Sequence, residues 1–178
     1  MRVPYTYDFP RPGVTVDVVL ATAGPRGELQ VLLIERGHDP FAGTWALPGG
    51  FVDEHEDLEV AARREMREET HLELGELVQL GAYGTPHRDP RGHTVGVAFL
   101  AVCGPDEVTP AAGDDAADCR WFDARRPPEL AFDHGVILRD ACQRFAELAA
   151  TEETFCRALC GGGRPAWLSA VRRAAQGC

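Results

Sequence analysis

Three glutamates, Glu65, Glu68 and Glu69, are spaced so that their carboxylates could act together on one ligand. On an α-helix, residues at positions i, i+3 and i+4 project from one face. Like charges at these spacings repel by about 0.2–0.5 kcal/mol per pair, whereas hard divalent cations such as Mg²⁺ prefer oxygen ligands of this kind. The pattern favours a metal site. The alternative is a solvated helix face on which glutamates, Glu69 among them, pair with neighbouring arginines.

The segment that carries these glutamates has the pattern of a helix. Apolar Leu58, Ala62 and Met66 recur at every fourth position, with strong helix formers between them and no Pro or Gly before Gly75. Asp57 suits the N-cap, where a side-chain oxygen accepts a hydrogen bond from a free backbone N–H group. We therefore expect a helix that begins after Asp57.

A longer spacing connects this helix to the glycine turn before it. A glycine, five residues, a glutamate, seven residues, Arg-Glu, an apolar residue, any residue and Glu-Glu follow one another. This order resembles the Nudix box, GX5EX7REUXEEXGU, and six fixed residues would coincide by chance about once in 10⁷ starting positions. The fixed residues are Gly50, Glu56, Arg64, Glu65, Glu68 and Glu69.

The resemblance extends over about residues 10–148 and implies an α/β protein with the Nudix fold, an α/β/α sandwich with a mixed β-sheet. It also implies hydrolysis of a nucleoside diphosphate linked to another moiety. Attack of water on a diphosphate brings negative charge together, so the reaction needs cations that screen the phosphates and lower the pKa of bound water. Carboxylate ligands favour Mg²⁺ (or Mn²⁺) over zinc.

Roles for the metal site follow from the helix and the resemblance. We expect Glu65 and Glu69 to be the principal metal ligands and Glu68 to be a ligand or a general base. The resemblance adds the backbone carbonyl of Gly49, just before the box glycine. Substitution of Glu69 by Gln is therefore predicted to keep the fold and to abolish most of the turnover.

Other box positions have supporting roles. Arg64 is expected to orient the loop against the helix through a charge-assisted hydrogen bond to Glu56, and Gly50 to allow the backbone close to a ligand. One position departs from the family: His71 stands where a glycine normally ends the helix. Histidine enters the left-handed region at a cost of about 1–2 kcal/mol, so the departure concerns the helix exit and not the glutamates.

Two loops carry candidate substrate and catalytic residues. In the first, GTPHRDPRGH, the Asp-Pro-Arg-Gly core is typical of a plain hairpin turn. The segment is also similar to one in ADP-ribose-hydrolysing Nudix proteins, which implies that Arg88 and Arg91 reach a phosphate or a ribose. The second loop, AGDDAAD, could be merely solvated. By the same resemblance, its Asp114 and Asp115 are candidates for a general base or an extra metal ligand.

The remaining pattern divides the chain into a Nudix domain, 1–150, and a short helical appendage, 151–178. Strands are predicted at 13–22 and 29–35, which form a hairpin, and at 77–83, 94–102 and 119–122. An amphipathic helix over 132–148 closes the domain against the sheet. The appendage is expected to hold a short helix up to residue 160, a glycine hinge at 161–163 and a last helix around 167–175.

Composition limits the partners and the location. A net charge of −10 and a pI near 5.0 argue against a nucleic-acid backbone as partner, because such binding needs a basic patch. The N-terminus lacks the apolar core of a signal peptide and no run is long enough to cross a membrane, which predicts a cytoplasmic protein with six reduced thiols. The alternating aromatic residues Tyr5, Tyr7 and Phe9, together with the family resemblance, predict a homodimer.

Three classes of function are compatible with this sequence. The leading one is hydrolysis of ADP-ribose to AMP and ribose 5-phosphate, and a related one is hydrolysis of nucleoside triphosphates or nucleotide-sugars. The second class is a non-catalytic ADP-ribose-binding module, as in Nudix repressors that carry a winged helix. The complete set of box carboxylates and the short segment after Ala150 count against it. The third is an interaction protein that keeps the fold without metal-dependent turnover.

Overall fold

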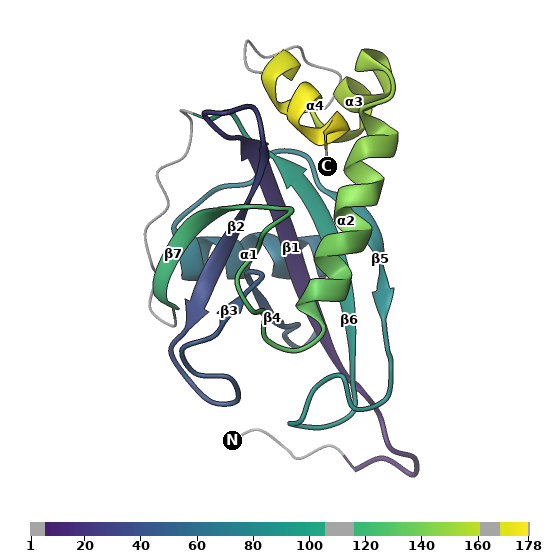
Figure 1. Cartoon of the computed structure of the whole chain (residues 1–178). Coiled ribbons are helices and arrows are strands. Elements are labelled where there is room, and N and C mark those ends of the chain that lie inside the picture. Colours follow the sequence, from purple (N-terminus) through teal and green to yellow (C-terminus); the bar gives the residue numbers. More distant parts are fainter. Residues whose placement is uncertain (1–5, 106–115, 161–167, 178) are drawn as a thin grey trace.

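A mixed β-sheet lies between helices in the computed structural model, which describes residues 6–105, 116–160 and 168–177. Figure 1 shows α1 behind the sheet and α2 along its front. This arrangement confirms the predicted α/β/α sandwich. In chain order the elements are β1 (Gly13–Ala23), β2 (Leu29–Arg36), β3 (Trp45–Ala46), β4 (Gly49–Phe51), α1 (Leu58–Thr70), β5 (Val78–Tyr83), β6 (Thr94–Val102), β7 (Ala116–Asp123), α2 (His134–Leu148), α3 (Glu152–Leu159) and α4 (Leu168–Gln176).

The central strand, β1, changes partners along its length. It runs parallel to β6 over nine residue pairs, from Gly13↔Thr94 to Ala21↔Val102. On its other side it pairs antiparallel with β4 at Thr15–Asp17 and with β2 only at Ala21–Ala23. Meanwhile β2 pairs with β3 and along β7. The sheet therefore divides between β1 and β2, and β4 and β3 border the division.

Alternate residues of the inner strands enter two separate cores. One face of β1 packs on α1 and the other on α2, α3 and α4, which is why both faces of the strand are buried. The α1 core includes Val16, Val18, Leu20, Ala61, Ala62 and Met66. The α2 core includes Val19, Ala21, Ile137, Phe145, Phe155 and Val171.

Helix α1 begins and ends at the residues that the sequence predicts. Asp57 accepts a hydrogen bond from the Glu59 N–H group, which confirms it as the N-cap. His71 is the C-cap, with φ 58° and ψ 23°, and its N–H group donates to the Arg67 carbonyl. The histidine thus adopts the left-handed conformation that the box normally assigns to glycine, and the helix exit is kept.

The two C-terminal helices, α3 and α4, pack beside the end of α2 (Figure 1). Their buried residues belong to the same core as those of β1 and α2, so the predicted appendage is helical and shares the domain's core where it is described. The predicted hinge at 161–163 lies outside the described residues. None of the described helices has both the length and the apolar character needed to cross a bilayer.

The cysteines differ from expectation at one position. Cys103, Cys119, Cys156 and Cys160 carry reduced thiols, as predicted. Cys142, on α2, is disulfide-bonded, so the expectation of reduced thiols throughout was wrong there.

Candidate active site

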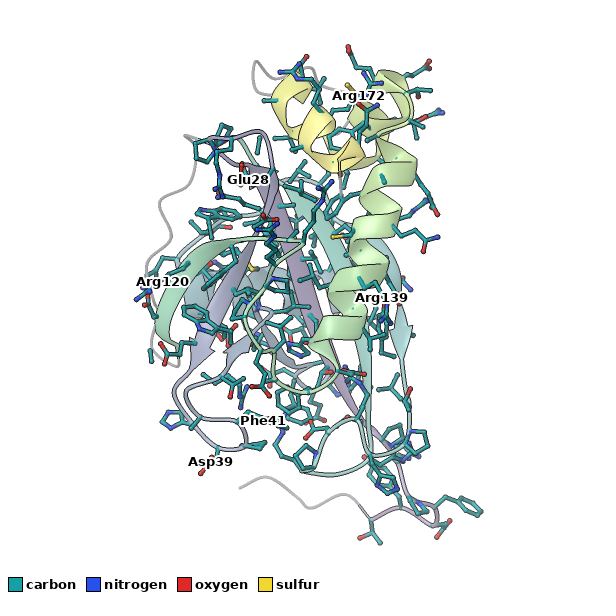
Figure 2. All side chains as sticks on the ribbon, in the orientation of Figure 1. Glu28, Asp39, Phe41, Arg120, Arg139 and Arg172 are labelled. Carbon is teal, nitrogen blue, oxygen red and sulfur yellow. The ribbon has the colours of Figure 1, made fainter. Side chains whose placement is uncertain are left out.

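A cleft opens where the end of β2, the short strand β4 and helix α1 meet, and it holds the main side chains of the box. Its volume is about 310 Å³, which falls in the range of small-molecule sites. Figure 2 labels Asp39 and Phe41, which lie in the loop after β2 at this end of the molecule. Besides Asp39, the polar lining consists of Arg36, His38, Glu65, Glu69 and Arg91.

Glu65 and Glu69 project from α1 onto the Gly49–Gly50 segment of β4. Glu69 accepts a hydrogen bond from the Gly49 N–H group at 2.9 Å. A Cβ atom at Gly50 would lie 2.5 Å from a Glu65 carboxylate oxygen, so the missing side chain makes room for that carboxylate. Burial raises the pKa of Glu65, against the opposing effect of Arg64. A bound cation would restore preference for its charged form.

These groups fit a hard divalent cation only with further ligands. Within the described ranges, no three His, Cys, Asp or Glu side chains are grouped closely enough to hold a metal. Glu68 is not part of the cleft lining: its side chain is 58% exposed and accepts a hydrogen bond from Arg64. Backbone, water or substrate oxygens would have to complete the coordination, as Mg²⁺ commonly allows. The candidate residues Asp114 and Asp115 lie outside the described residues.

Arg64 connects the box loop, β4 and α1 through hydrogen bonds. Its Nε and Nη2 atoms donate to both carboxylate oxygens of Glu56, at 2.8 and 2.9 Å. Nη1 donates to Glu65 at 2.7 Å, and Nη2 also donates to the Phe51 carbonyl at 3.0 Å. The contact that the spacing predicted between Arg64 and Glu56 is therefore present, and the same guanidinium also fixes the Glu65 carboxylate.

The pair of Glu56 and Arg64 predicts a specific loss of stability in acid. Hydrogen bonds from Arg64, and then from the Asp53 N–H group, lower the pKa of Glu56 from 4.5 to about 2. Because the folded-state pKa lies below the unfolded value, the stabilisation is present above pH 4.5 and is lost as the pH falls toward 2.

Urea unfolding of the wild type and of Glu56→Gln at several pH values measures this effect. We expect the variant to be less stable at pH 7 and the difference to shrink between pH 4.5 and 2. A difference that stays constant across this window would contradict the assignment.

The two arginines of the loop between β5 and β6 lie in different environments. Arg91 is 40% exposed, lies in the cleft and is held by Asp89 at 2.8 Å. The Arg88 side chain is only 5% exposed, and it donates to both carboxylate oxygens of Asp133 at 2.7 and 2.9 Å. The geometry places Arg91 where a phosphate could meet it, whereas Arg88 lies at the wall of a narrower cavity.

Arg36, at the end of β2, is a cleft residue that the sequence analysis did not identify. It donates to the Pro40 carbonyl at 2.8 Å and lies over the Phe132 ring at 4.9 Å. Arg91 lies over the same ring at 5.3 Å and over Phe51 at 4.9 Å. Burial, and then the charge of Arg91, lowers the pKa of Arg36. Two guanidinium groups thus share this wall, which suits an anionic ligand.

A buried polar cluster borders the cleft on the α2 side of the sheet. The Leu47 N–H group donates to His134 Nδ1 at 2.9 Å, which leaves the proton of the neutral imidazole on Nε2. That atom faces Asp17 Oδ1 at 3.4 Å, and the Arg88 guanidinium lies 3.8 Å from Asp17 Oδ2. Burial raises the pKa of Asp17 and lowers that of His134. Burial therefore disfavours the charged form of each group.

The sequence contained a signal for this cluster. The alternation of β1 favours a strand with Thr15 and Asp17 on a polar face, yet the two residues are 6% and 5% exposed. An aspartate inside an otherwise aliphatic strand marks a polar group that must find partners in the core. His134 is the fourth residue of the AFDHG segment, at the start of α2, and the sequence analysis gave it no role.

Comparison with known proteins decides the family. A model of the NUDIX domain matches residues 11–141. The chain belongs to the Nudix family. Among Nudix relatives, an ADP-ribose pyrophosphatase of Methanocaldococcus jannaschii is 42% identical over 129 residues, which are 72% of this chain and 72% of that protein. The ADPR responsive transcriptional repressor NtrR of Acinetobacter baylyi is 35% identical over 77% of this chain and 56% of the repressor.

Solved Nudix structures have the same fold. A MutT/nudix family protein from Enterococcus faecalis superposes with a TM-score of 0.76 at 33% identity, over 87% of this chain and 70% of that one. The NUDIX domain of Shewanella oneidensis NrtR, complexed with ADP ribose, superposes with a TM-score of 0.71 at 34% identity, over 78% and 93%. These identities support the family assignment as well as the fold.

Proposed function

We propose that this Nudix protein hydrolyses ADP-ribose to AMP and ribose 5-phosphate with Mg²⁺ (or Mn²⁺). The observation that carries the proposal is a single cleft in which Glu65 and Glu69 face the guanidinium groups of Arg36 and Arg91. Such a cleft can hold a metal ion and a diphosphate side by side. The Nudix relative named as an ADP-ribose pyrophosphatase, at 42% identity, supports this choice of substrate.

The proposed role of each side chain follows from its position in the cleft. Nudix hydrolases generally use divalent metal ions, and the bound ion would screen the phosphates and lower the pKa of the attacking water. Glu65 and Glu69 would hold the ion. Arg36 and Arg91 would neutralise the phosphate oxygens from the opposite wall.

The general base is also part of the proposal. Glu68, held at the edge of the site by Arg64, is the described candidate. Asp114 and Asp115 are the others.

Two alternative functions would use the same cleft. A non-catalytic ADP-ribose-binding role is favoured by the similarity to the repressor NtrR, although this chain spans only 56% of that protein. Hydrolysis of triphosphates or nucleotide-sugars would use the same carboxylates and differ at the sugar side of the cleft.

A substrate panel tests the proposal. The wild type is incubated with ADP-ribose, NADH, nucleotide-sugars and nucleoside triphosphates, with Mg²⁺, with Mn²⁺ and with EDTA, and AMP is quantified. We expect metal-dependent release of AMP mainly from ADP-ribose. Turnover mainly of triphosphates would replace the substrate assignment, whereas ADP-ribose binding without turnover would favour the binding role.

Homodimerisation and a cytoplasmic location are further parts of this proposal. Tyr7 and Phe9 are 47% and 79% exposed, which leaves apolar surface for a second copy of the chain. Light scattering of the wild type and of Phe9→Ser tests the assembly. Cell fractionation tests the location.

A further inference from the structure

A narrow polar cavity continues from the cleft toward α2. Arg36, Arg91, Gly49 and Gly50 line both spaces, so a molecule whose diphosphate occupies the cleft can reach the cavity. The cavity measures about 50 Å³. Small-molecule sites usually measure about 300–1,000 Å³, so this narrow space suits a small polar group of a ligand that is held mainly in the cleft.

Asp17 supplies an unused hydrogen-bond acceptor in this cavity. Its carboxylate is buried, and Oδ2 has no hydrogen-bond partner among the residues that the structure describes. The nearest guanidinium, that of Arg88, is 3.8 Å away from Oδ2 and is already bonded to Asp133. Buried polar atoms nearly always have a partner, so this oxygen points to a ligand or to a water molecule that a ligand replaces.

The packing around Oδ2 depends on a glycine. A Cβ atom at Gly96 would lie 3.0 Å from Asp17 Oδ2, 2.8 Å from Arg88 Nη1 and 3.1 Å from the Thr15 hydroxyl. Any larger residue on β6 would push against these three groups. The sequence therefore leaves the acceptor, a hydroxyl and a guanidinium grouped over a bare stretch of backbone.

The charges around the cavity select the kind of donor. Three guanidinium groups, those of Arg36, Arg88 and Arg91, line it beside the two carboxylates of Asp17 and Asp89, so the lining has an excess of positive charge that disfavours an ammonium group or a metal ion. A neutral hydroxyl can donate to Asp17 without this penalty. Because Arg36 and Arg91 also face the phosphate position, the hydroxyl must belong to a group attached directly to the diphosphate.

We infer that Asp17 Oδ2 accepts a hydrogen bond from a hydroxyl of the sugar attached to the diphosphate, and that it selects hydroxylated sugars over groups without one. This inference rests on the proposed function and adds the residue that recognises the sugar. His134 and Arg88 act as positioning residues, because they fix the carboxylate without reaching the cleft themselves.

Calorimetric titration in EDTA tests the inference without turnover. The ligands are ADP-ribose and the P2-methyl ester of ADP, which keeps the diphosphate and lacks the terminal sugar. We expect the wild type to bind ADP-ribose about 10- to 100-fold more tightly than the ester, as for a hydrogen bond to a charged group. In Asp17→Ala, which has no side-chain acceptor at this position, that preference should fall by a similar factor. Asp140→Ala, on α2 outside the cavity, is the matched control and should keep the preference.

Each outcome of the titration either supports or overturns the inference about Asp17. An equal affinity of the wild type for both ligands, or an unchanged preference in Asp17→Ala, would overturn the inference. Equal losses for both ligands would assign Asp17 a purely structural role and overturn it as well. Thermal unfolding of Asp17→Ala identifies a folding defect, and in that case Gly96→Ala, which crowds the same oxygen, must lose the preference. Selective binding in EDTA without turnover in Mg²⁺ or Mn²⁺ would support the inference while refuting the proposed hydrolysis.

Discussion

Replacing Glu69 by Gln should reduce metal-dependent turnover by about 100-fold or more while the protein stays folded. The variant loses a negative charge in the cleft, where the metal would bind. Its amide oxygen can still accept the hydrogen bond that the Gly49 N–H group gives to Glu69 at 2.9 Å, so β4 should stay in place. Initial rates of AMP release, with circular dichroism as the check on folding, measure both effects.

Glu73→Gln is the matched control. Glu73 lies just after α1, has a side chain 76% exposed and pairs only with Arg67 among the contacts described for it. We expect its turnover to equal that of the wild type. Full activity of Glu69→Gln, or an equal loss in both variants, would remove Glu69 from the metal site.

Replacing Arg88 by Met should destabilise the protein by about 3–5 kcal/mol. The side chain is 5% exposed and is bonded to both oxygens of Asp133, and it also faces the buried carboxylate of Asp17. Removing the guanidinium leaves two carboxylates close together without their cation. Urea unfolding at pH 7 measures the change.

Arg139→Met provides the comparison. Arg139 lies on α2 and points away from the sheet, as Figure 2 shows, with a side chain 73% exposed. Its loss should change stability by less than about 0.5 kcal/mol. If Arg88→Met instead kept full stability and only raised KM, Arg88 would be a direct substrate contact, the role that the loop resemblance implies.

The parts of the site that could be predicted are those encoded locally. The helix α1, its N-cap Asp57 and the contact from Arg64 to Glu56 all arise within a single short segment, where spacing alone places the side chains. The strands of the sheet followed from alternation and turn residues. The left-handed C-cap at His71 followed from the position that the box gives to glycine.

The rest of the site depends on contacts between distant segments. Arg36 ends one strand, Asp17 lies inside another and His134 begins α2, and only the division of the sheet brings them to one cavity beside the cleft. The loop pattern at Arg88 and Arg91 gave no means to tell which arginine turns inward. That choice depends on Asp133, 45 residues away in the chain.

The burial of Asp17 on β1 also bears on how the sheet assembles. Most residues of the ladder between β1 and β6 are apolar, and because both faces of β1 are buried, a change of alignment would still bury apolar side chains. A shift of β1 by one residue would turn the carboxylate into the apolar core that contains Ala61, Ala62 and Met66 of α1. Burying an unpaired charge costs several kcal/mol, so misaligned pairings are penalised during folding. The buried aspartate therefore favours the native alignment of β1 with β6, independently of any ligand.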